Sequence, residues 1–241
     1  MRVVAILCIL IGANYSALNA QSRDSYDYNS EFIWGINKNS SSGLIGGLVL
    51  KRSKKVNDKT LQTYGLEIVN IRHPQEQRKS AQGGNFFIYG KSNYLYALRL
   101  QYGRDFILFQ KAPQQGVEIK AVFSAGPTIG IVAPYYIERG VDGSSGLLTV
   151  KEQYDPKKHN FDDITGNAGP FYGLNESKIH MGGNLKAALN FETGVMKSQV
   201  TGFEVGFLLD AYFKKVIIVP TAPNKAVYPT IFLTIFYGTS R

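Results

Sequence analysis

The most regular feature of the chain is the alternation of apolar and polar side chains over long stretches. Between Val200 and Phe213, one set of alternate residues is almost purely apolar, whereas the other set mixes acidic residues with glycines. The stretches 178–193 and 116–132 divide in the same way. Because successive side chains of a β-strand point to opposite faces, this pattern predicts strands with one apolar and one polar face.

Eight segments of this kind can be marked along the chain, and the last four show the alternation most clearly. Seven of the eight are longer than ten residues, whereas strands of soluble proteins typically have about five or six. Tilted strands that cross a membrane have about 9–11 residues plus their ends. The pattern therefore predicts an all-β fold, an eight-stranded antiparallel up-and-down transmembrane β-barrel, with strands at 30–39, 43–54, 59–72, 93–103, 116–132, 178–193, 200–213 and 226–238.

The connections between these segments differ in length in a way that fits a membrane barrel. With the N-terminus in the periplasm, three of the four external loops are long and two of the three periplasmic turns are short. This is the arrangement of outer-membrane barrels, and an even number of strands places both termini in the periplasm. The external loops are predicted at 40–42, 73–92, 133–177 and 214–225, and the periplasmic turns at 55–58, 104–115 and 194–199.

The N-terminus predicts export from the cytoplasm of a Gram-negative cell. Arg2 is followed by an apolar run over 3–11 and then by small and polar residues up to Ala20. This pattern predicts a signal peptide over residues 1–20, which leaves a barrel with long external loops over residues 21–241. The single cysteine, Cys8, lies inside the apolar run. The residues just before it lack the small side chains expected ahead of a lipidated cysteine, so lipidation is the less favoured alternative.

Composition fits this fold and excludes a helical membrane protein. The mean hydropathy is −0.13, and aromatic residues make up 12% of the chain. A helical membrane protein is far more apolar, whereas a membrane barrel hides its apolar residues by alternation; a soluble β-sandwich has a similar composition. The net charge of +9 favours contact with anionic lipid head groups or an acidic partner. No motif for nucleic-acid binding is present in the sequence.

The polar faces of the predicted strands carry charged side chains that would point into the barrel. An eight-stranded barrel is just wide enough for side chains to fill its interior. Buried charges need partners of opposite sign, so we expect a salt-bridge network that plugs the lumen. An ion path or a hydrolytic pair of carboxylates is the alternative. The four basic and five acidic residues of the predicted network are Lys51, Glu67, Arg99, Glu118, Lys120, Lys186, Glu192, Glu204 and Asp210.

The sequence shows no set of residues typical of catalysis or metal binding. The three histidines, His73, His159 and His180, are not spaced as metal ligands. No Gly-x-Ser-x-Gly motif is present. We therefore expect no enzyme activity, no metal and no cofactor, and a catalytic site at the barrel rim around His73 or His159 is the alternative.

Loop 133–177 is the best candidate for contact with a partner, because loops longer than about 12–15 residues are usually functional or disordered. Glycines and serines at 140–146 predict a flexible first part, whereas 154–171 brackets aromatic residues with turn formers. The aromatic run at 86–89 is a second candidate for docking. The residues expected to contact a partner are Tyr135, Tyr136, Tyr154, Asp155, Pro156, His159 and Phe171.

A set of short motifs between residues 30 and 238 is distinctive in combination. It comprises KAPQQGVEI at 111–119, SAGP at 124–127, PYY at 134–136, YDP at 154–156 with His159, DI at 163–164 with Gly166, Ala168 and PF at 170–171, FE at 191–192, EVG at 204–206 and LD at 209–210. In these motifs the chain resembles a family of small outer-membrane β-barrels of Bacteroidota. The resemblance implies an uncharacterised or accessory envelope barrel and not an enzyme. The C-terminus departs from the usual pattern, since four residues follow Tyr237 and displace the terminal aromatic residue inward.

These features together predict a non-enzymatic outer-membrane barrel that is an accessory subunit of an outer-membrane protein assembly or secretion machinery. The β-barrel assembly machinery and surface-export systems are machines of this kind. The expected partners are outer-membrane lipids, including lipopolysaccharide, and other envelope proteins of such a membrane protein complex. Three alternatives stay open, namely a narrow channel or small-ligand transporter, a rim-located enzyme and a soluble secreted barrel.

Overall fold

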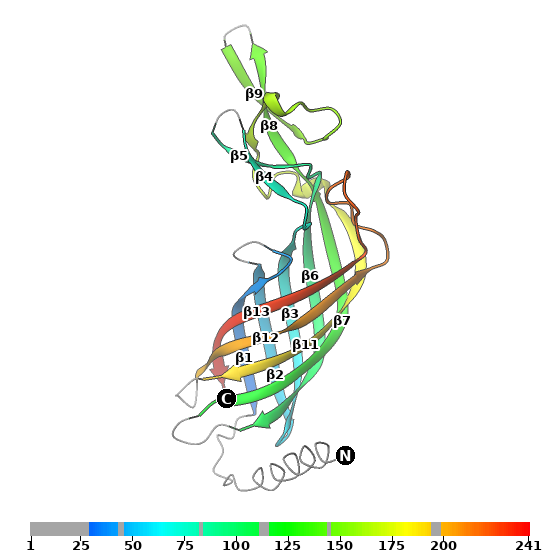
Figure 1. The fold of residues 1–241 in the computed structure, drawn as a ribbon. Helices are drawn as coiled ribbons and strands as arrows, with labels where there is room; N and C mark the ends of the chain where they lie inside the picture. Colours follow the sequence, from blue (N-terminus) through cyan, green and yellow to red (C-terminus); the bar gives the residue numbers. More distant parts are fainter. Residues whose placement is uncertain (1–28, 43–45, 82–83, 111–115, 144–145, 194–198) are drawn as a thin grey trace, which may run out of the picture.

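Eight strands close into an antiparallel barrel, which confirms the predicted fold class (Figure 1). The computed structural model describes residues 29–42, 46–81, 84–110, 116–143, 146–193 and 199–241. Around the barrel the strands follow the order β1-β13-β12-β11-β7-β6-β3-β2, and the first and last strands pair with each other. The strands are β1 (Ser30–Asn39), β2 (Gly47–Asn57), β3 (Thr60–Ile71), β6 (Asn93–Phe109), β7 (Glu118–Pro134), β11 (Lys178–Glu192), β12 (Gln199–Tyr212) and β13 (Val227–Ser240).

The strand bounds agree with the alternation of the sequence to within two residues except in β2 and β6. The turn predicted at 55–58 is wrong up to residue 57, because β2 continues to Asn57. The turn predicted at 104–115 is wrong in its first half, because β6 continues to Phe109. Its inward residue Asp105 is buried and pairs with a lysine across the lumen, which keeps the alternation going beyond Gly103. The second strand begins at Gly47, and the predicted start at 43–45 lies outside the described residues. The predicted signal peptide at 1–20 also lies outside them.

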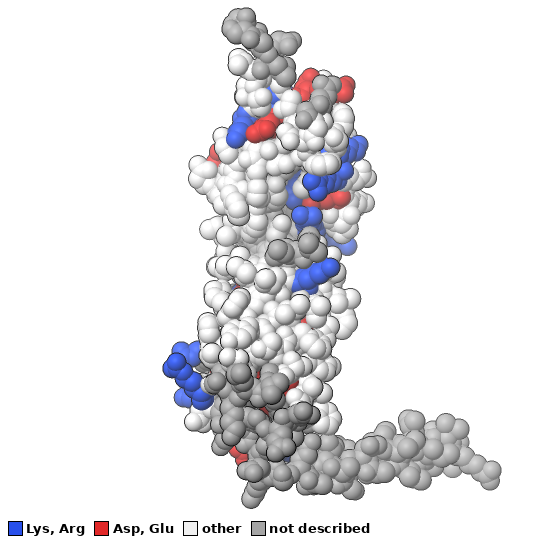
Figure 2. All heavy atoms as spheres, turned by 90° about the vertical axis from the view of Figure 1, so that its left-hand side faces the viewer, with Lys and Arg blue, Asp and Glu red and all other residues white. Residues whose placement is uncertain are grey.

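The outer wall of the barrel is apolar and exposed, as a surface in contact with lipid should be. Outward side chains such as Leu185, Phe207 and Ile235 are 61–67% exposed, while their neighbours in the chain point inward and are buried. Figure 2 shows this wall as mostly white, with Lys and Arg gathered near its lower end and again at and above its upper end. A closed sheet pairs every strand and leaves no backbone edge open to lipid, so this wall is that of a transmembrane barrel.

Aromatic side chains gather near the barrel end that is opposite to the long loops. Trp34 packs edge-on against Tyr237 at 6.1 Å, and Tyr64 lies 5.4 Å from Tyr102 between ring centroids. Rings with polar tips are enriched at membrane–water interfaces, so these residues form part of an interfacial girdle. Among the described residues, no helix is long and apolar enough to cross a membrane.

The long loops carry a folded subdomain that stands on the strands β6 and β7 (Figure 1), and we call it the external subdomain because the sequence predicts its loops to be external. The loop predicted at 73–92 contains the hairpin β4 (Gln77–Ser80) and β5 (Phe86–Tyr89). The loop predicted at 133–177 contains a sheet in the order β10-β8-β9 and two short 3-10 helices. Its elements are β8 (Tyr136–Gly143), β9 (Gly146–Gln153), η1 (Phe161–Asp163), β10 (Ile164–Asn167) and η2 (Leu174–Glu176).

The prediction of a flexible first part of loop 133–177 is therefore wrong. The strands β8 and β9 pair in register from Tyr136 and Gln153 to Gly143 and Gly146. Gly140, Gly143 and Gly146 thus belong to paired strands of a hairpin, whereas the serines at 144–145 lie outside the described residues. The composition of the segment hid the pairing because the two strands are short and one of their faces is polar.

Candidate functional site

The charged residues inside the barrel form a continuous chain of alternating sign. Consecutive groups lie 2.6–3.3 Å apart, and none of the side chains is more than 6% exposed. The chain crosses the lumen several times, since most of its pairs join strands that are not neighbours in the sheet. Its members in order are Asp105, Lys51, Glu204, Lys186, Glu67, Arg99 and Asp210.

Arg99 is the most completely engaged member of this chain. Its Nε and Nη2 donate to the two carboxylate oxygens of Asp210 at 3.1 and 2.6 Å, and its Nη1 donates to Glu67 at 3.1 Å. The hydroxyl of Thr128 also donates to Asp210, at 3.2 Å. The interaction of a planar guanidinium with a carboxylate through two parallel hydrogen bonds is strong and fixes the orientation of the two groups. This arrangement holds β3, β6 and β12 together across the lumen.

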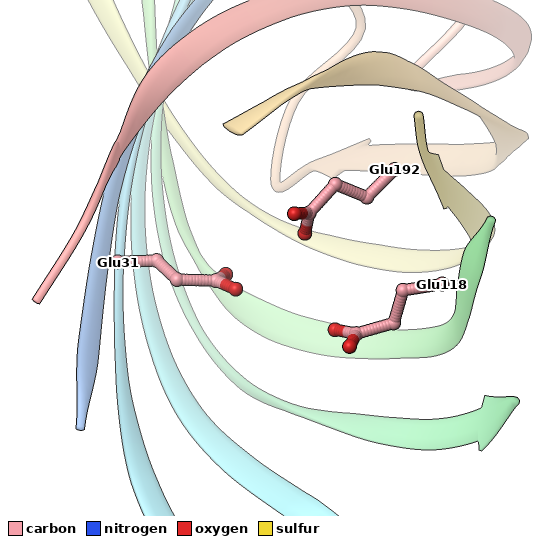
Figure 3. Close-up of side chains that lie close together, drawn as sticks. All are labelled: Glu31, Glu118 and Glu192. Carbon is pink, nitrogen blue, oxygen red and sulfur yellow. The ribbon is translucent and has the colours of Figure 1, made fainter. Parts of the chain in front are cut away.

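A second cluster of charges, whose carboxylates Figure 3 shows, lies at the end of the barrel opposite to the external subdomain, where β1 and β7 begin and β11 ends. The carboxylates of Glu31, Glu118 and Glu192 point toward one another, with oxygen atoms within 4.8 Å. Three carboxylates at this spacing suit a divalent cation in principle. However, the ammonium of Lys120 lies 2.6, 3.0 and 3.3 Å from Glu31, Glu118 and Glu192 respectively. The positive charge of this cluster is thus supplied by a side chain of the protein.

The structure thus places all nine residues of the predicted lumen network inside the barrel and brings them into two clusters. The sequence reading missed Glu31 and Asp105, which are buried and pair with Lys120 and Lys51. Glu31 is the first inward residue of β1, and Asp105 lies in the part of β6 that was assigned to a turn. Glu31 already lies on the inward face of the predicted strand 30–39, and Asp105 would have been found by continuing the alternation of 93–103 by two residues.

The upper part of the lumen is filled by apolar side chains instead of charges. Val216, Ile218 and Val219, from the loop between β12 and β13, are at most 3% exposed. They pack with Tyr212 and Tyr228 against the inner faces of β3 and β6. Lower down, a cavity beside Lys51 and Lys186 measures about 10 Å³, which holds one water molecule at most. The lumen is therefore closed by an apolar cap above and by ion pairs below.

This filling predicts that the protein does not conduct ions. In planar lipid bilayers the purified protein should give no resolvable open-channel current, because an ion would have to displace buried ion pairs at a cost that the membrane potential does not supply. A porin inserted into the same bilayer is the positive control. Stable, voltage-independent current steps from the wild-type protein would contradict the closed lumen and favour the channel alternative.

The external subdomain has its own core, and two residues of the predicted partner set belong to it. Tyr135 and Tyr154 are 0% and 2% exposed and pack with Phe87, Ile137 and Ile164. The hydroxyl of Tyr135 accepts a hydrogen bond from the backbone N–H of Ile88 at 2.9 Å. Burial raises the pKa of Tyr135 to about 12, so its hydroxyl stays protonated. Both tyrosines were expected to contact a partner, and their burial assigns them to the core instead.

The other residues of the predicted partner set lie at or near the surface. His159 stacks on Tyr154 with 5.8 Å between ring centroids, and its Nε2 lies 3.1 Å from Glu152. Asp155 and Pro156 form the partly exposed turn before it. Among the described residues, neither His73 nor His159 is hydrogen-bonded to a serine hydroxyl, so the pairing that a rim-located serine enzyme needs is not assembled there.

Phe171, the last residue of the predicted set, belongs to an exposed apolar segment. Phe171, Tyr172 and Leu174, which we call the 171–174 segment, are 72%, 44% and 39% exposed. Tyr136 supports this segment, since its ring lies 5.0 Å from that of Tyr172 and its hydroxyl donates to Glu176 at 2.7 Å. Gly173 has a φ of +81°, and a Cβ there would meet the Tyr136 ring at 2.7 Å, so only glycine fits this turn.

Cations and aromatic rings also meet on the β4–β5 hairpin. The guanidinium of Arg78 lies 4.0 Å from the ring centroid of Phe86, which is 47% exposed. The ammonium of Lys79 lies 4.1 Å from the ring centroid of Tyr89 and 5.5 Å from that of Phe161. These contacts order long cationic side chains on the outer surface. The sequence pointed to the aromatic run at 86–89, but it gave no sign of the stacking or of Phe161.

A buried ion pair fixes the hairpin to the mouth of the barrel. The Nζ of Lys91 is fully buried and lies 2.9 Å from Glu76 and 4.3 Å from the ring centroid of Tyr94. Burial lowers the pKa of Lys91, and the nearby charge of Arg72 lowers it further, whereas Glu76 opposes both effects. Lys91 therefore depends on Glu76 to stay charged, and the pair ties the start of the hairpin to its end.

Comparison with known proteins gives matches at the level of solved structures. No family model and no curated protein matches the chain. One similar structure is that of Ail, the attachment invasion locus protein of Yersinia pestis, in complex with the heparin analogue sucrose octasulfate. Its sequence is 9% identical, the match covers 89% of this chain and 99% of that chain, and the TM-score is 0.40. Another is Neisserial surface protein A, with 10% identity, 89% and 97% covered, and a TM-score of 0.37.

Proposed function

We propose that this protein is a non-enzymatic outer-membrane barrel that acts as an accessory subunit of an envelope protein assembly. The support comes from the division of the molecule into two parts. The barrel has a lipid-compatible wall and a filled lumen, so it acts as an anchor. The external subdomain has its own core and exposes an apolar segment to solvent. Assembly or secretion machinery of the outer membrane is the class of partner that suits an anchored docking module.

The observation that carries the proposal is the exposure of the 171–174 segment on a rigid support. Phe171 is 72% exposed, and a ring held outward at this exposure has apolar surface available for burial against another protein. Large aromatic side chains are enriched among the residues that dominate binding energy at interfaces. The glycine turn at Gly173 and the Tyr136 support hold the segment before any partner arrives, which lowers the entropy lost on binding.

The membrane orientation follows from the same proposal. The subdomain faces the cell exterior, and both termini lie in the periplasm. Ser30 donates its backbone N–H to the carbonyl oxygen of Arg241 at 2.8 Å, so the first described strand and the C-terminus lie together at the end away from the subdomain. Lys214 and Lys215 follow the 84% exposed Phe213 at the upper rim. These lysines are placed to contact phosphate groups of outer-membrane lipids.

Co-purification from mild detergent tests the proposal. The wild-type protein, extracted from its native outer membrane, should carry a stoichiometric envelope protein, and Phe171→Asp should lose it because the substitution puts a charge into the apolar contact. Val56→Asp makes the same kind of change at an exposed site at the other end of the barrel and should keep the partner. A wild-type protein that elutes alone, or a partner that survives Phe171→Asp, would count against this assignment.

A further inference from the structure

A cavity of about 540 Å³ lies where the external subdomain meets the mouth of the barrel. Its floor comes from the loop after β1 and from the start of β13, and its wall comes from the β4–β5 hairpin. Sites for small organic ligands typically measure about 300–1,000 Å³. The cavity is thus large enough for a ligand, and it is distinct from the filled lumen and from the 171–174 segment.

Three cations line this cavity without an acidic partner. Arg72, Arg78 and Lys225 are all exposed, and within the described parts of the chain none of them forms an ion pair. The guanidinium of Arg78 is ordered by the ring of Phe86 at 4.0 Å, and this ring also lines the cavity. Positive charges that converge on a concave surface attract anions, since the low-dielectric walls focus the field.

The remaining titratable groups of the cavity do not cancel this charge. Glu76 is paired with the buried Lys91 at 2.9 Å, so the two are neutral together. His73 accepts a hydrogen bond at Nδ1 from the backbone N–H of Gln75, so its Nε2 carries the hydrogen and donates to the carbonyl oxygen of Pro223 at 3.3 Å. The cavity therefore holds three formal positive charges, from Arg72, Arg78 and Lys225.

The rest of the lining suits a sugar more than a bare ion. Hydroxyl groups come from Ser40 and Ser41, and apolar surface comes from Phe86 and Pro229. The Oγ of Ser40 accepts a hydrogen bond from the backbone N–H of Ile231, which leaves its own O–H to donate. A saccharide presents both hydroxyl groups and apolar ring faces, so it can use both kinds of surface, whereas inorganic phosphate would fill only part of the volume.

We propose that this cavity binds a saccharide that carries phosphate groups. The phosphates lie against Arg72, Arg78 and Lys225, and the sugar ring packs against Phe86 and hydrogen-bonds to the serine hydroxyls. Guanidinium groups bind phosphate through paired hydrogen bonds, and a phosphate group offers more negative charge and more acceptor oxygens than a carboxylate. Such a ligand is either the head group of a membrane glycolipid or a free phosphorylated oligosaccharide.

Isothermal titration calorimetry with the full protein in detergent micelles tests this proposal. The probe is the de-acylated, bisphosphorylated glucosamine disaccharide of lipid A. It should bind saturably, and its dephosphorylated form and inorganic phosphate should bind much more weakly. The double variant R72Q/R78Q should lose about tenfold or more in affinity, equal to about 1.4 kcal/mol. Lys157→Gln, which removes an exposed cation of the same subdomain outside the cavity, should bind like the wild type.

A parallel arm separates the two sources of the ligand and guards against misfolding. If the membrane glycolipid occupies the cavity, the soluble probe should bind more weakly to the protein in nanodiscs that contain lipid A than in nanodiscs that contain only phosphatidylglycerol. If the natural ligand is a free saccharide, the probe should bind equally well in both. Both results support the site. Heat-modifiable migration on gels shows whether each variant keeps its barrel. The proposal is overturned if the wild type shows no saturable binding, or if K157Q loses affinity as R72Q/R78Q does.

Discussion

Replacing Arg99 with methionine should lower the free energy of unfolding of the barrel by about 3–5 kcal/mol, the usual result of removing one partner of a buried ion pair. Arg99 is 1% exposed and satisfies both Asp210 and Glu67. Without it, two carboxylates remain in the lumen with fewer partners, and the cost of their desolvation is no longer offset. Urea unfolding of the refolded protein in lipid vesicles, followed by tryptophan fluorescence of Trp34, measures the change.

Two controls separate this effect from a general loss of packing. Arg104→Met makes the same substitution on the same strand at an exposed, outward position and should not destabilise the barrel. The triple variant R99M/E67Q/D210N removes the orphaned charges together with the arginine, so it should recover part of the lost stability. If R99M and R104M proved equally stable, the chain of ion pairs would contribute nothing to the barrel.

Truncating Tyr135 to alanine should unfold the external subdomain and leave the barrel intact. Removing a fully buried aromatic side chain lowers the free energy of unfolding by about 3–5 kcal/mol. A small subdomain has little stability beyond that amount. Trypsin should then cut at Lys151, Lys157 and Lys158, while the barrel stays resistant and keeps its heat-modifiable migration. Tyr135→Phe, which loses the acceptor for the Ile88 N–H but keeps the ring, should stay folded with a smaller loss.

The same experiment distinguishes core residues from contact residues. Phe171→Ala should leave the trypsin pattern unchanged, because the ring is exposed and supports nothing. A role of Tyr135 in direct partner contact would instead give an intact subdomain in Y135A with partner binding lost. If the lysine sites stay protected from trypsin in Y135A, Tyr135 belongs to the contact surface and not to the core.

The barrel could be predicted from the sequence because each strand repeats one local rule. The outward residues of β12 and β13 alternate with buried ones over the whole length of each strand, and a closed barrel needs only this alternation and the sorting of loop lengths. The inward charges were found for the same reason. The partners of each charge were not, because the contact between Lys51 and Glu204 depends on barrel closure and on strand register, which no local pattern encodes.

The external subdomain escaped prediction for a related reason. Its strands are short, and Tyr135 and Tyr136 are adjacent tyrosines with opposite roles, one in the core and one beneath the 171–174 segment. An alternation of only a few residues is too brief to assign inside and outside. The mouth cavity draws its lining from seven separate parts of the chain, so its cations appeared in the sequence only as scattered surface charges.

The ion pairs across the lumen also set the order in which the barrel can enter a membrane. Lys51 and Glu204 are 153 residues apart in the chain, Glu67 and Lys186 are 119 apart, and Arg99 and Asp210 are 111 apart. Lys51 pairs with Asp105 and Glu67 pairs with Arg99 within β2, β3 and β6, but the second partners of Lys51, Glu67 and Arg99 arrive only with the last strands to be synthesised. Inserting β2, β3 and β6 alone would bring these two ion pairs into hydrocarbon without their remaining native partners. The strands must accordingly enter the bilayer together, as a sheet that has already begun to close.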